Sequence, residues 1–272
     1  MRIGFIGAGA MASAIAHGVA ASAGGHEIVV TDVVAASAER VAAAVGGTAV
    51  PDADALVREV GPDGLVVVAV KPHVVLGVLE GVRESLAETG APVVSIAAGL
   101  QLATLTSAVP DGHPVVRAMP NVAAQVGVGA AAVCGNDAAT EQQVSAVVEV
   151  FEAVGTAEVL EERHFSAFTA IAGSSPAFVF QLVDSLARAA VAAGLPKAQA
   201  VRIAAQAAAG AGTLARELAA EGTSPQDLVD RVCSPGGTTV AGMVALDAAG
   251  FPAAVVAGAN AVMARDAELA GD

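Results

Sequence analysis

The chain has 272 residues, of which 55% are hydrophobic, and its formal net charge is -14 at pH 7. This length suits two domains with a sizeable core, and the acidic balance argues against nucleic acids and anionic membrane surfaces as partners. No apolar run reaches the roughly 18 residues that a membrane span needs before Gly, Pro, Gln or a charged residue interrupts it.

The cysteine content predicts a reduced protein without a metal site. The two cysteines, Cys134 and Cys233, are too few for a disulfide framework and lack metal-ligand spacing. The N-terminus begins a strand at once, with no basic region and cleavage site, so we expect no signal peptide and a cytoplasmic location. Lysine occurs only at Lys71 and Lys197, and this composition fits either a salt-adapted source or GC-rich coding.

A glycine-rich turn follows the first predicted strand, residues 2–6, and precedes a helical pattern at residues 13–23. Gly7 permits a tight turn, Gly9 lets a diphosphate approach the backbone, and Ala12 lets the helix pack closely on the strand. The alternative is a glycine-rich turn that binds nothing. The strand–turn–helix context favours a dinucleotide site formed by Gly7, Ala8, Gly9, Ala10, Met11 and Ala12.

The second predicted strand, residues 27–31, ends at Asp32. In a dinucleotide-binding fold, a carboxylate at this place accepts a hydrogen bond from the 2′-OH of NAD and repels the 2′-phosphate of NADP. No Lys or Arg follows before Arg40. These residues favour NADH over NADPH, although Asp is also a common helix cap.

More strand-length runs follow before residue 160, and they are interrupted by one clear helical pattern at residues 140–153. The runs occupy residues 64–70, 92–99, 126–133 and 158–160. Continuous apolar runs are typical of strands covered on both faces, so we expect a mainly parallel sheet whose strand order the sequence does not fix. Ala97 is in a strand end of small residues, where a nicotinamide or ribose could lie against the backbone.

The pattern changes to alanine-rich helices after residue 160. Helices are predicted at residues 164–172, 176–193, 196–220, 225–233, 238–249 and 252–270. We therefore predict an α/β fold, with a Rossmann-like dinucleotide-binding domain at residues 1–160 followed by an all-α domain at residues 161–272. Its alanine and valine faces have few long side chains to cover them, so we expect this helical domain to form a homodimer.

A loop in the helical half has the features of an anion site. Ser234-Pro235 ends the preceding helix, and Gly236-Gly237 allow a sharp turn and close approach of a ligand. The next helix starts with unpaired N–H groups beside the hydroxyls of Thr238 and Thr239. Spacing alone equally permits a tight helix–loop–helix with an ordinary cap.

Five segments, in this order, resemble the pyrroline-5-carboxylate reductase family. They are the glycine turn, Ala-Val-Lys-Pro at residues 69–72, Arg-Ala-Met-Pro-Asn at 117–121, Gly-Ser-Ser-Pro-Ala at 173–177 and Pro-Gly-Gly-Thr-Thr at 235–239. The last is long and specific. The resemblance implies an oxidoreductase of proline biosynthesis that uses NADPH or NADH to reduce the cyclic imine L-1-pyrroline-5-carboxylate to L-proline. It also implies a dimer through the helical domain, often assembled into larger rings.

The resemblance also implies roles for individual residues. Ala69, Val70, Lys71 and Pro72 would line the phosphate and ribose side of the cofactor, and Asn121 would border the nicotinamide or the substrate. Arg117 could equally tie down its loop, and His73 is an ordinary helix-start residue. The substrate carboxylate would be held by the loop of Ser234, Gly236, Gly237 and Thr238, and the ring nitrogen would be hydrogen-bonded by Thr239.

The chain departs from the family pattern in three places, and alternatives stay open. Ser175 replaces a common glycine, and the family's phosphate-friendly Asn-Arg after the second strand is missing, as is an Asn around residues 52–54. A sensor that binds nucleotide without turnover is therefore one alternative. A β-hydroxyacid dehydrogenase is another, but that family uses a lysine within a long helix and Lys197 lies near a helix start. A six-membered imine could also be the substrate.

Overall fold

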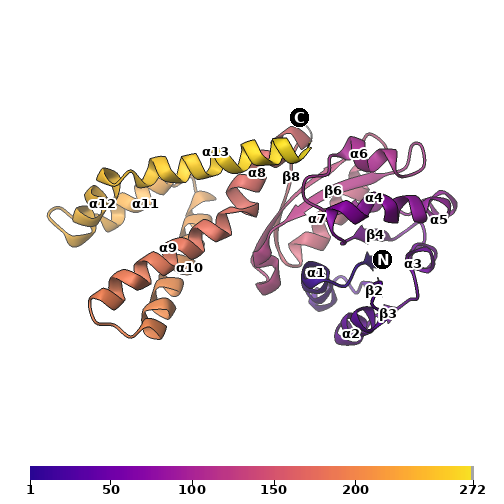
Figure 1. Cartoon of the computed structure of the whole chain (residues 1–272), viewed down its shortest axis with the longest axis horizontal. Coiled ribbons are helices and arrows are strands. Elements are labelled where there is room, and N and C mark those ends of the chain that lie inside the picture. Colours follow the sequence, from indigo (N-terminus) through magenta and orange to yellow (C-terminus); the bar gives the residue numbers. More distant parts are fainter. Residues whose placement is uncertain (271–272) are drawn as a thin grey trace. The chain divides into compact units, whose positions relative to one another are not determined.

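The apolar strands of the first part of the chain form one eight-stranded sheet in the computed structural model, which describes residues 1–270 (Figure 1). The strand order is β3-β2-β1-β4-β5-β6-β7-β8, and the described pairs are parallel except for β6 and β7. The chain order reverses between β1 and β4, the place where open α/β sheets bind ligands. The strands are β1 (Arg2–Ile6), β2 (Glu27–Thr31), β3 (Thr48–Ala49), β4 (Leu65–Val68), β5 (Val93–Ser95), β6 (Val115–Pro120), β7 (Gly129–Gly135) and β8 (Gly155–Val159).

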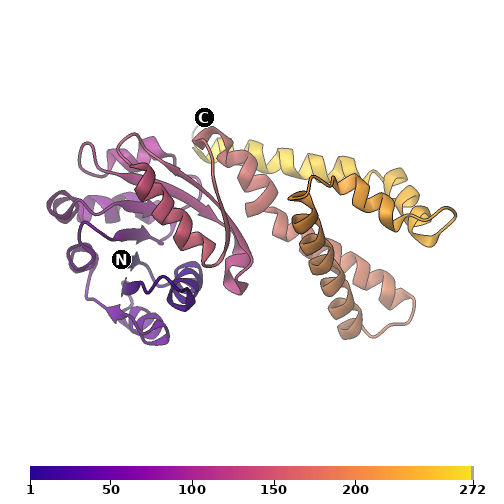
Figure 2. The ribbon, with the colours of Figure 1, turned by 180° about the vertical axis from the view of Figure 1, so that it is seen from behind.

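Helices cover both faces of this sheet, as Figures 1 and 2 show. Side chains alternate along each strand, so Phe5 joins one buried cluster and Ile6 the other. The first cluster includes α1 (Ala10–Ala21), α2 (Ala35–Val45) and α7 (Glu141–Glu152). The second cluster includes α3 (Ala53–Val60), α4 (Pro72–Gly81), α5 (Arg83–Thr89), α6 (Leu102–Ser107) and α8 (Phe165–Phe168).

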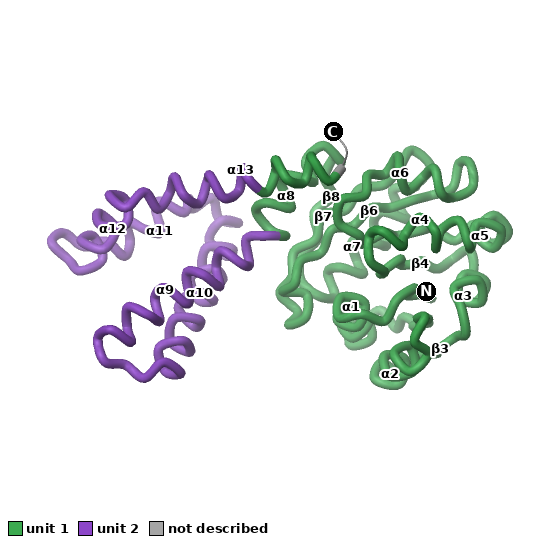
Figure 3. The backbone as a smooth tube through the Cα atoms, viewed as in Figure 1, with its two compact units in different colours: residues 1–173, 262–272 green, residues 174–261 purple. Residues whose placement is uncertain are grey.

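The chain divides into two compact units, coloured separately in Figure 3. The sheet unit contains Met1–Gly173 and the end of the chain from Val262, and the helical unit contains Ser174–Ala261. The boundary between the units lies after Gly173, later than the boundary expected at residue 160. It lies later because Phe165 and Phe168 of α8 are buried in the core of the sheet unit. In addition, the Ser166 hydroxyl donates to the Met263 carbonyl at 3.4 Å, which ties the end of the chain to α8.

The helical unit exposes much of its apolar surface. It consists of α9 (Ser175–Ala192), α10 (Lys197–Ala219), α11 (Pro225–Val232), α12 (Thr238–Ala248) and the first part of α13 (Phe251–Ala270). Phe180 is 64% exposed and Ile203 is 54% exposed. The sequence showed no uninterrupted apolar run long enough for a membrane span. In the structure, however, the stretch Glu162–Ala192 is long and apolar enough to cross a membrane, with a mean hydropathy of 1.3. The bent pair of α12 and α13 passes the same test of length and composition.

Three local predictions were wrong or incomplete. The helix expected from residue 13 begins at Ala10, and Gly9 is its N-cap. The segment of residues 115–120 is strand β6, which we did not predict as a strand. The helix expected at residues 164–172 is α8 followed by a π-helical turn, η3 (Thr169–Gly173). The five long helices of the helical half begin and end within about two residues of their predicted bounds.

Gly4 of β1 lies at the closest approach between the sheet and α3. A Cβ atom on Gly4 would be 2.5 Å from both Leu56 Cδ2 and Val60 Cγ2. These two side chains are buried in the core, so they have little freedom to move away. The absence of a side chain at Gly4 therefore sets how closely α3 packs on β1.

We expect Gly4→Ala to lower the free energy of unfolding by about 1–3 kcal/mol through overpacking. The matched control is Gly77→Ala, because Gly77 is in α4 with no atom within 4 Å of an added Cβ. That change should raise stability by up to about 1 kcal/mol through helix propensity. The urea midpoint followed by far-UV circular dichroism checks both, since the chain has no Trp or Tyr for fluorescence. Equal effects of the two changes would contradict the packing at Gly4.

Candidate functional site

A cleft of about 840 Å³ opens in the sheet unit at the carboxyl ends of β1, β2, β4 and β5. This is the edge and the topological position at which open α/β sheets bind ligands. Most of the residues predicted to hold a cofactor line this cleft. They are Gly7, Gly9, Ala10, Met11, Asp32, Ala69, Val70, Lys71, Pro72 and Ala97.

The turn between β1 and α1 is held closely between its neighbours. The Gly7 N–H donates to the Thr31 carbonyl at 2.8 Å. Gly7 has a φ of 108°, and a Cβ atom there would lie 2.8 Å from the Ala69 carbonyl oxygen. Only glycine fits both the backbone angle and the space. Ala12 is 1% exposed beneath the cleft, so it packs α1 on the sheet and does not line the cleft.

Gly9 leaves room where a dinucleotide diphosphate would lie. It has φ -72° and ψ -179°, which any residue adopts, and no atom lies within 4 Å of an added Cβ. Gly9 is also the N-cap of α1, whose first turn receives no side-chain cap hydrogen bond. The first N–H groups of a helix have no partner within the helix and attract anions. These residues therefore fit the diphosphate of a nicotinamide dinucleotide.

Asp32 fixes the end of β2 to the glycine turn. Its Oδ2 accepts a hydrogen bond from the Ala8 N–H at 2.8 Å, and its Oδ1 accepts one from the Val34 N–H at 2.8 Å. Each carboxylate oxygen has a second lone pair, so the group can still accept from a ribose hydroxyl. Ala8 itself is buried and takes part through this N–H.

Lys71 is the only Lys or Arg among the described residues that line the cleft. It is the N-cap of α4 and follows β4, so two strands separate it from β3 in the sheet order. Arg40 lines a neighbouring groove with Ser13 and His17 of α1, and this groove shares Gly9, Ala10 and Gln125 with the cleft. The end of the cleft beside β2 and β3 therefore has no cationic side chain among its described lining residues.

Asn121 serves its own loop. Its Nδ2 donates to the Ala172 carbonyl at 2.9 Å, and its Oδ1 accepts from the N–H groups of Ala123 at 3.1 Å and Ala130 at 3.2 Å. The side chain is 9% exposed and does not line the cleft. Asn121 follows Met119 and Pro120, which line the cleft, but is not itself among the lining residues. Its contact with a cofactor stays a prediction.

Arg117 is an internal brace. Its Nη1 lies 2.8 Å from Glu162 Oε1, and its guanidinium carbon lies 4.5 Å from the centre of the Phe165 ring. The same Glu162 oxygen accepts the Leu102 N–H at 2.7 Å, at the start of α6. Burial, together with the negative charge of Glu162, raises the pKa of the nearby Cys134 thiol to about 12, which favours the protonated thiol at neutral pH.

The predicted substrate loop forms a tight turn in the helical unit. The Gly237 N–H donates to the Ser234 carbonyl at 3.0 Å, and Gly236 has a φ of 70°. Pro235 followed by a glycine with positive φ is typical of a type II turn. Gly237 is the N-cap of α12, which starts at Thr238 and has no side-chain cap hydrogen bond. Thr238 and Thr239 are exposed, so their hydroxyls and the first N–H groups of α12 are open to an anion.

Two further residues bear on the alternatives. Ser175 begins α9, and within residues 1–270 no residue other than glycine has a positive φ, so serine meets the backbone geometry there. Lys197 is the first residue of α10 and is exposed. It lies at the first position of this helix and not in its interior, where the β-hydroxyacid dehydrogenase alternative requires a lysine.

Several residues that line the cleft were not predicted as cofactor contacts, and the most important is Asp52, since residues 52–54 were noted only for a missing Asn. Ile96, Met119, Gln125 and Asp52 all contribute to its walls. Asp52 reaches the cleft because β3 pairs with β2, with Ala49 beside Val30. A strand of two residues leaves no periodic signal in the sequence.

Comparisons with known proteins match the chain from end to end. The family description "Pyrroline-5-carboxylate reductase dimerisation" matches residues 162–269, and "NADP oxidoreductase coenzyme F420-dependent" matches residues 2–99. The pyrroline-5-carboxylate reductase of Methanosarcina acetivorans is 37% identical over 96% of this chain and 94% of its own length. That of Escherichia coli K12 is 36% identical over 98% of each chain.

Solved structures match the whole chain as well. A pyrroline-5-carboxylate reductase from Coxiella burnetii has a TM-score of 0.90 and 30% identity, covering 98% of this chain and 97% of its own. The Plasmodium falciparum pyrroline carboxylate reductase, solved with NADP bound, has a TM-score of 0.82 and 25% identity, covering 99% and 98%.

The open space at Gly9 gives a direct test of the cleft. We expect Gly9→Val to fold normally, because no atom lies within 4 Å of an added Cβ. The change should raise the Kd for NADH and NADPH by about tenfold or more, because it blocks the path of the diphosphate. Titration of dinucleotide fluorescence measures the Kd, and Gly77→Ala serves as the control that keeps wild-type affinity. Unchanged affinity in a folded Gly9→Val protein would show that the dinucleotide binds elsewhere.

Proposed function

The chain belongs to the pyrroline-5-carboxylate reductase family, and we propose that it works with NADH in preference to NADPH. It is an oxidoreductase that reduces the cyclic imine L-1-pyrroline-5-carboxylate to L-proline, the last step of proline biosynthesis. The single observation that carries this function is an identity of 36–37% to two reductases over nearly the full length of the chain. The imine takes up one hydride and one proton, and the reduced dinucleotide leaves oxidised.

The cofactor proposal depends on the adenosine end of the cleft. Asp32 lies where a carboxylate accepts from the ribose 2′-OH, and a 2′-phosphate would face its negative charge. Lys71 follows the carboxyl end of β4, which is separated from β2 by β1 in the sheet. The Plasmodium falciparum relative was solved with NADP, and NADPH is the second candidate for this chain. The absence of a cation near Asp32 among the described lining residues favours NADH here.

Residues of the sheet unit bind and orient the dinucleotide. We assign the diphosphate to the N–H groups at Gly9, Ala10 and Met11, at the start of α1. Small side chains at Ala69 and Ala97 let the ring and ribose lie against the backbone, and Lys71 offers a positive charge beside the phosphates. A bound, reduced nicotinamide supplies the hydride. The protein holds the reacting groups together and excludes water.

Residues of the helical unit are proposed to bind the imine. The N–H groups in the first turn of α12, after Gly236 and Gly237, hold the substrate carboxylate. The Thr239 hydroxyl holds the proton at the ring nitrogen, and the Ser234 and Thr238 hydroxyls lie in the same loop. An imine accepts hydride readily once its nitrogen is protonated, so no strongly perturbed acid is needed. The six-membered piperideine carboxylate carries the same carboxylate and nitrogen and is the alternative substrate.

The helical unit is also proposed to form a homodimer. The dimerisation family description covers residues 162–269, and exposed apolar side chains such as Phe180 and Ile203 lie on these helices. Burial against a second copy accounts for this surface without a membrane. A larger ring of dimers is an extension of this proposal.

Cys134 and Cys233 are both free thiols, and we place the protein in the cytoplasm.

The cofactor preference is tested by oxidation of NADH and NADPH by purified protein with pyrroline-5-carboxylate. We expect kcat/KM with NADH to exceed that with NADPH by about tenfold, and Asp32→Ala to reduce this ratio, because the 2′-phosphate no longer meets the Asp32 charge. Faster turnover with NADPH would keep the reductase and overturn the NADH preference. Tight dinucleotide binding without turnover of either cofactor would instead favour the sensor alternative.

The role of Thr239 is tested by removing its hydroxyl. We expect Thr239→Val to lower kcat by about 100-fold, because a proton-holding group is lost, while the Kd for NADH stays unchanged. Thr239→Ser keeps the hydroxyl and should recover most of the rate. Stopped-flow measurement of a single turnover checks the chemical step. An unchanged rate in Thr239→Val would overturn the role of the hydroxyl, whereas a loss in Thr239→Ser alone would indicate a packing role for the methyl group.

A further inference from the structure

A second carboxylate lies at the same end of the cleft as Asp32. β2 and β3 are parallel neighbours, with Val30 beside Ala49, so the residues that follow each strand emerge at the same edge of the sheet. Asp32 follows β2, and Asp52 follows β3. Both line the nucleotide cleft, with Val33 and Ala53 beside them.

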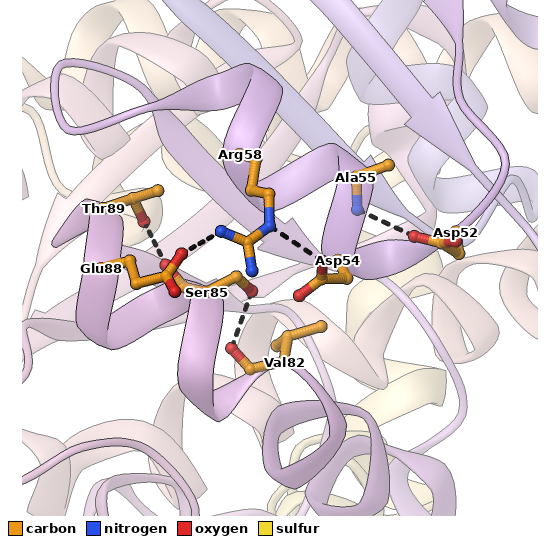
Figure 4. Close-up of polar contacts among 8 residues, drawn as sticks. All are labelled: Asp52, Asp54, Ala55, Arg58, Val82, Ser85, Glu88 and Thr89. Atoms are coloured by element: carbon orange, nitrogen blue, oxygen red, sulfur yellow. Dashed lines mark hydrogen bonds and ion pairs between the residues drawn. The ribbon is translucent and has the colours of Figure 1, made fainter.

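Asp52 uses one carboxylate oxygen to cap the N-terminus of its own helix, α3. It is the N-cap of α3, and its Oδ1 accepts a hydrogen bond from the Ala55 N–H at 2.8 Å (Figure 4). A carboxylate needs only one oxygen for this cap. Its negative charge therefore remains at the adenosine end of the cleft.

The cationic side chain nearest to Asp52 in the sequence is already paired with two carboxylates. Arg58 of α3 donates from Nε to Asp54 Oδ2 at 3.0 Å, and its Nη1 pairs with Glu88 of α5 (Figure 4). The hydrogen bond with Arg58 lowers the pKa of Asp54 below its usual value, so Asp54 stays charged in this pair. Asp54, in contrast with Asp52, does not line the cleft.

We propose that Asp52 is a second specificity-determining residue, which acts with Asp32 to exclude a 2′-phosphorylated dinucleotide. This inference rests on the proposed function, because it assumes that the cleft binds a nicotinamide dinucleotide. A 2′-phosphate carries close to two negative charges at neutral pH. Among the described lining residues, this end of the cleft has two carboxylates and no cation, so the cleft wall offers the 2′-phosphate no compensating charge.

Asp52→Asn isolates the charge from the cap. Asn is as good an N-cap as Asp, so α3 should remain intact while one negative charge is removed. The matched control is Asp54→Asn, in the same turn of α3 but outside the cleft. Both variants leave Asp32, the glycine turn and the substrate loop unchanged.

Calorimetric titration with ADP-ribose and 2′-phospho-ADP-ribose separates the two nucleotides without any turnover. Coulomb interaction across a hydrated cleft predicts that Asp52→Asn strengthens binding of the 2′-phosphorylated ligand about threefold to tenfold relative to ADP-ribose. The change should shrink as salt is raised from about 0.05 M to 0.5 M. Asp54→Asn should leave the ratio of the two Kd values unchanged.

The possible outcomes test the role of Asp52 and the preference for NADH independently. An unchanged ratio in Asp52→Asn, or an equal change in both variants, would overturn the role of Asp52. If the wild-type protein prefers the 2′-phosphorylated ligand and Asp52→Asn strengthens that preference, the NADH proposal fails while Asp52 keeps its role. If neither ligand binds, the cleft is not a dinucleotide site and both proposals fail.

Discussion

The cleft depends on how closely the glycine turn is held between the ends of β2 and β4. The Gly7 N–H bonds to Thr31 on one side, and the Ala69 carbonyl leaves no space for a Cβ on the other. The Asp32 carboxylate then fixes the next N–H, that of Ala8. These contacts orient the start of α1 toward the cleft, so a stable sheet core and an anion site follow from the same short turn.

Local signals made part of the site predictable from the sequence. Gly7, Gly9 and the acid after the second strand have fixed spacing from a strand, and the structure places all three on one cleft. Residues 52–54 were noted only for a missing Asn, because the position of Asp52 in the cleft depends on the pairing of a two-residue strand. The bonds of Asn121 to Ala172 and Ala130 depend on contacts between distant segments, which no local pattern records.

The two units illustrate two kinds of predictability. In the sheet unit, strand types were readable but strand order and the brace between Arg117 and Glu162 were not, because both depend on tertiary pairing. In the helical unit, prolines and glycines marked the helix ends closely, as at Pro225 and Gly236. Its amphipathic helices expose apolar residues that a single chain leaves uncovered. The sequence already predicted from this surface that the helical domain pairs with a second copy, and the dimerisation family description covers residues 162–269.

The bond between Ser166 and Met263 joins residues separated by 97 positions in the chain. Closing a flexible loop of that length costs about 4 kcal/mol of chain entropy. Helices formed within the intervening segment shorten the effective loop and reduce this cost. Closure of this contact is therefore less costly once the helices between the two residues have formed. During synthesis, the sheet unit must also wait for the last part of the chain before it is complete.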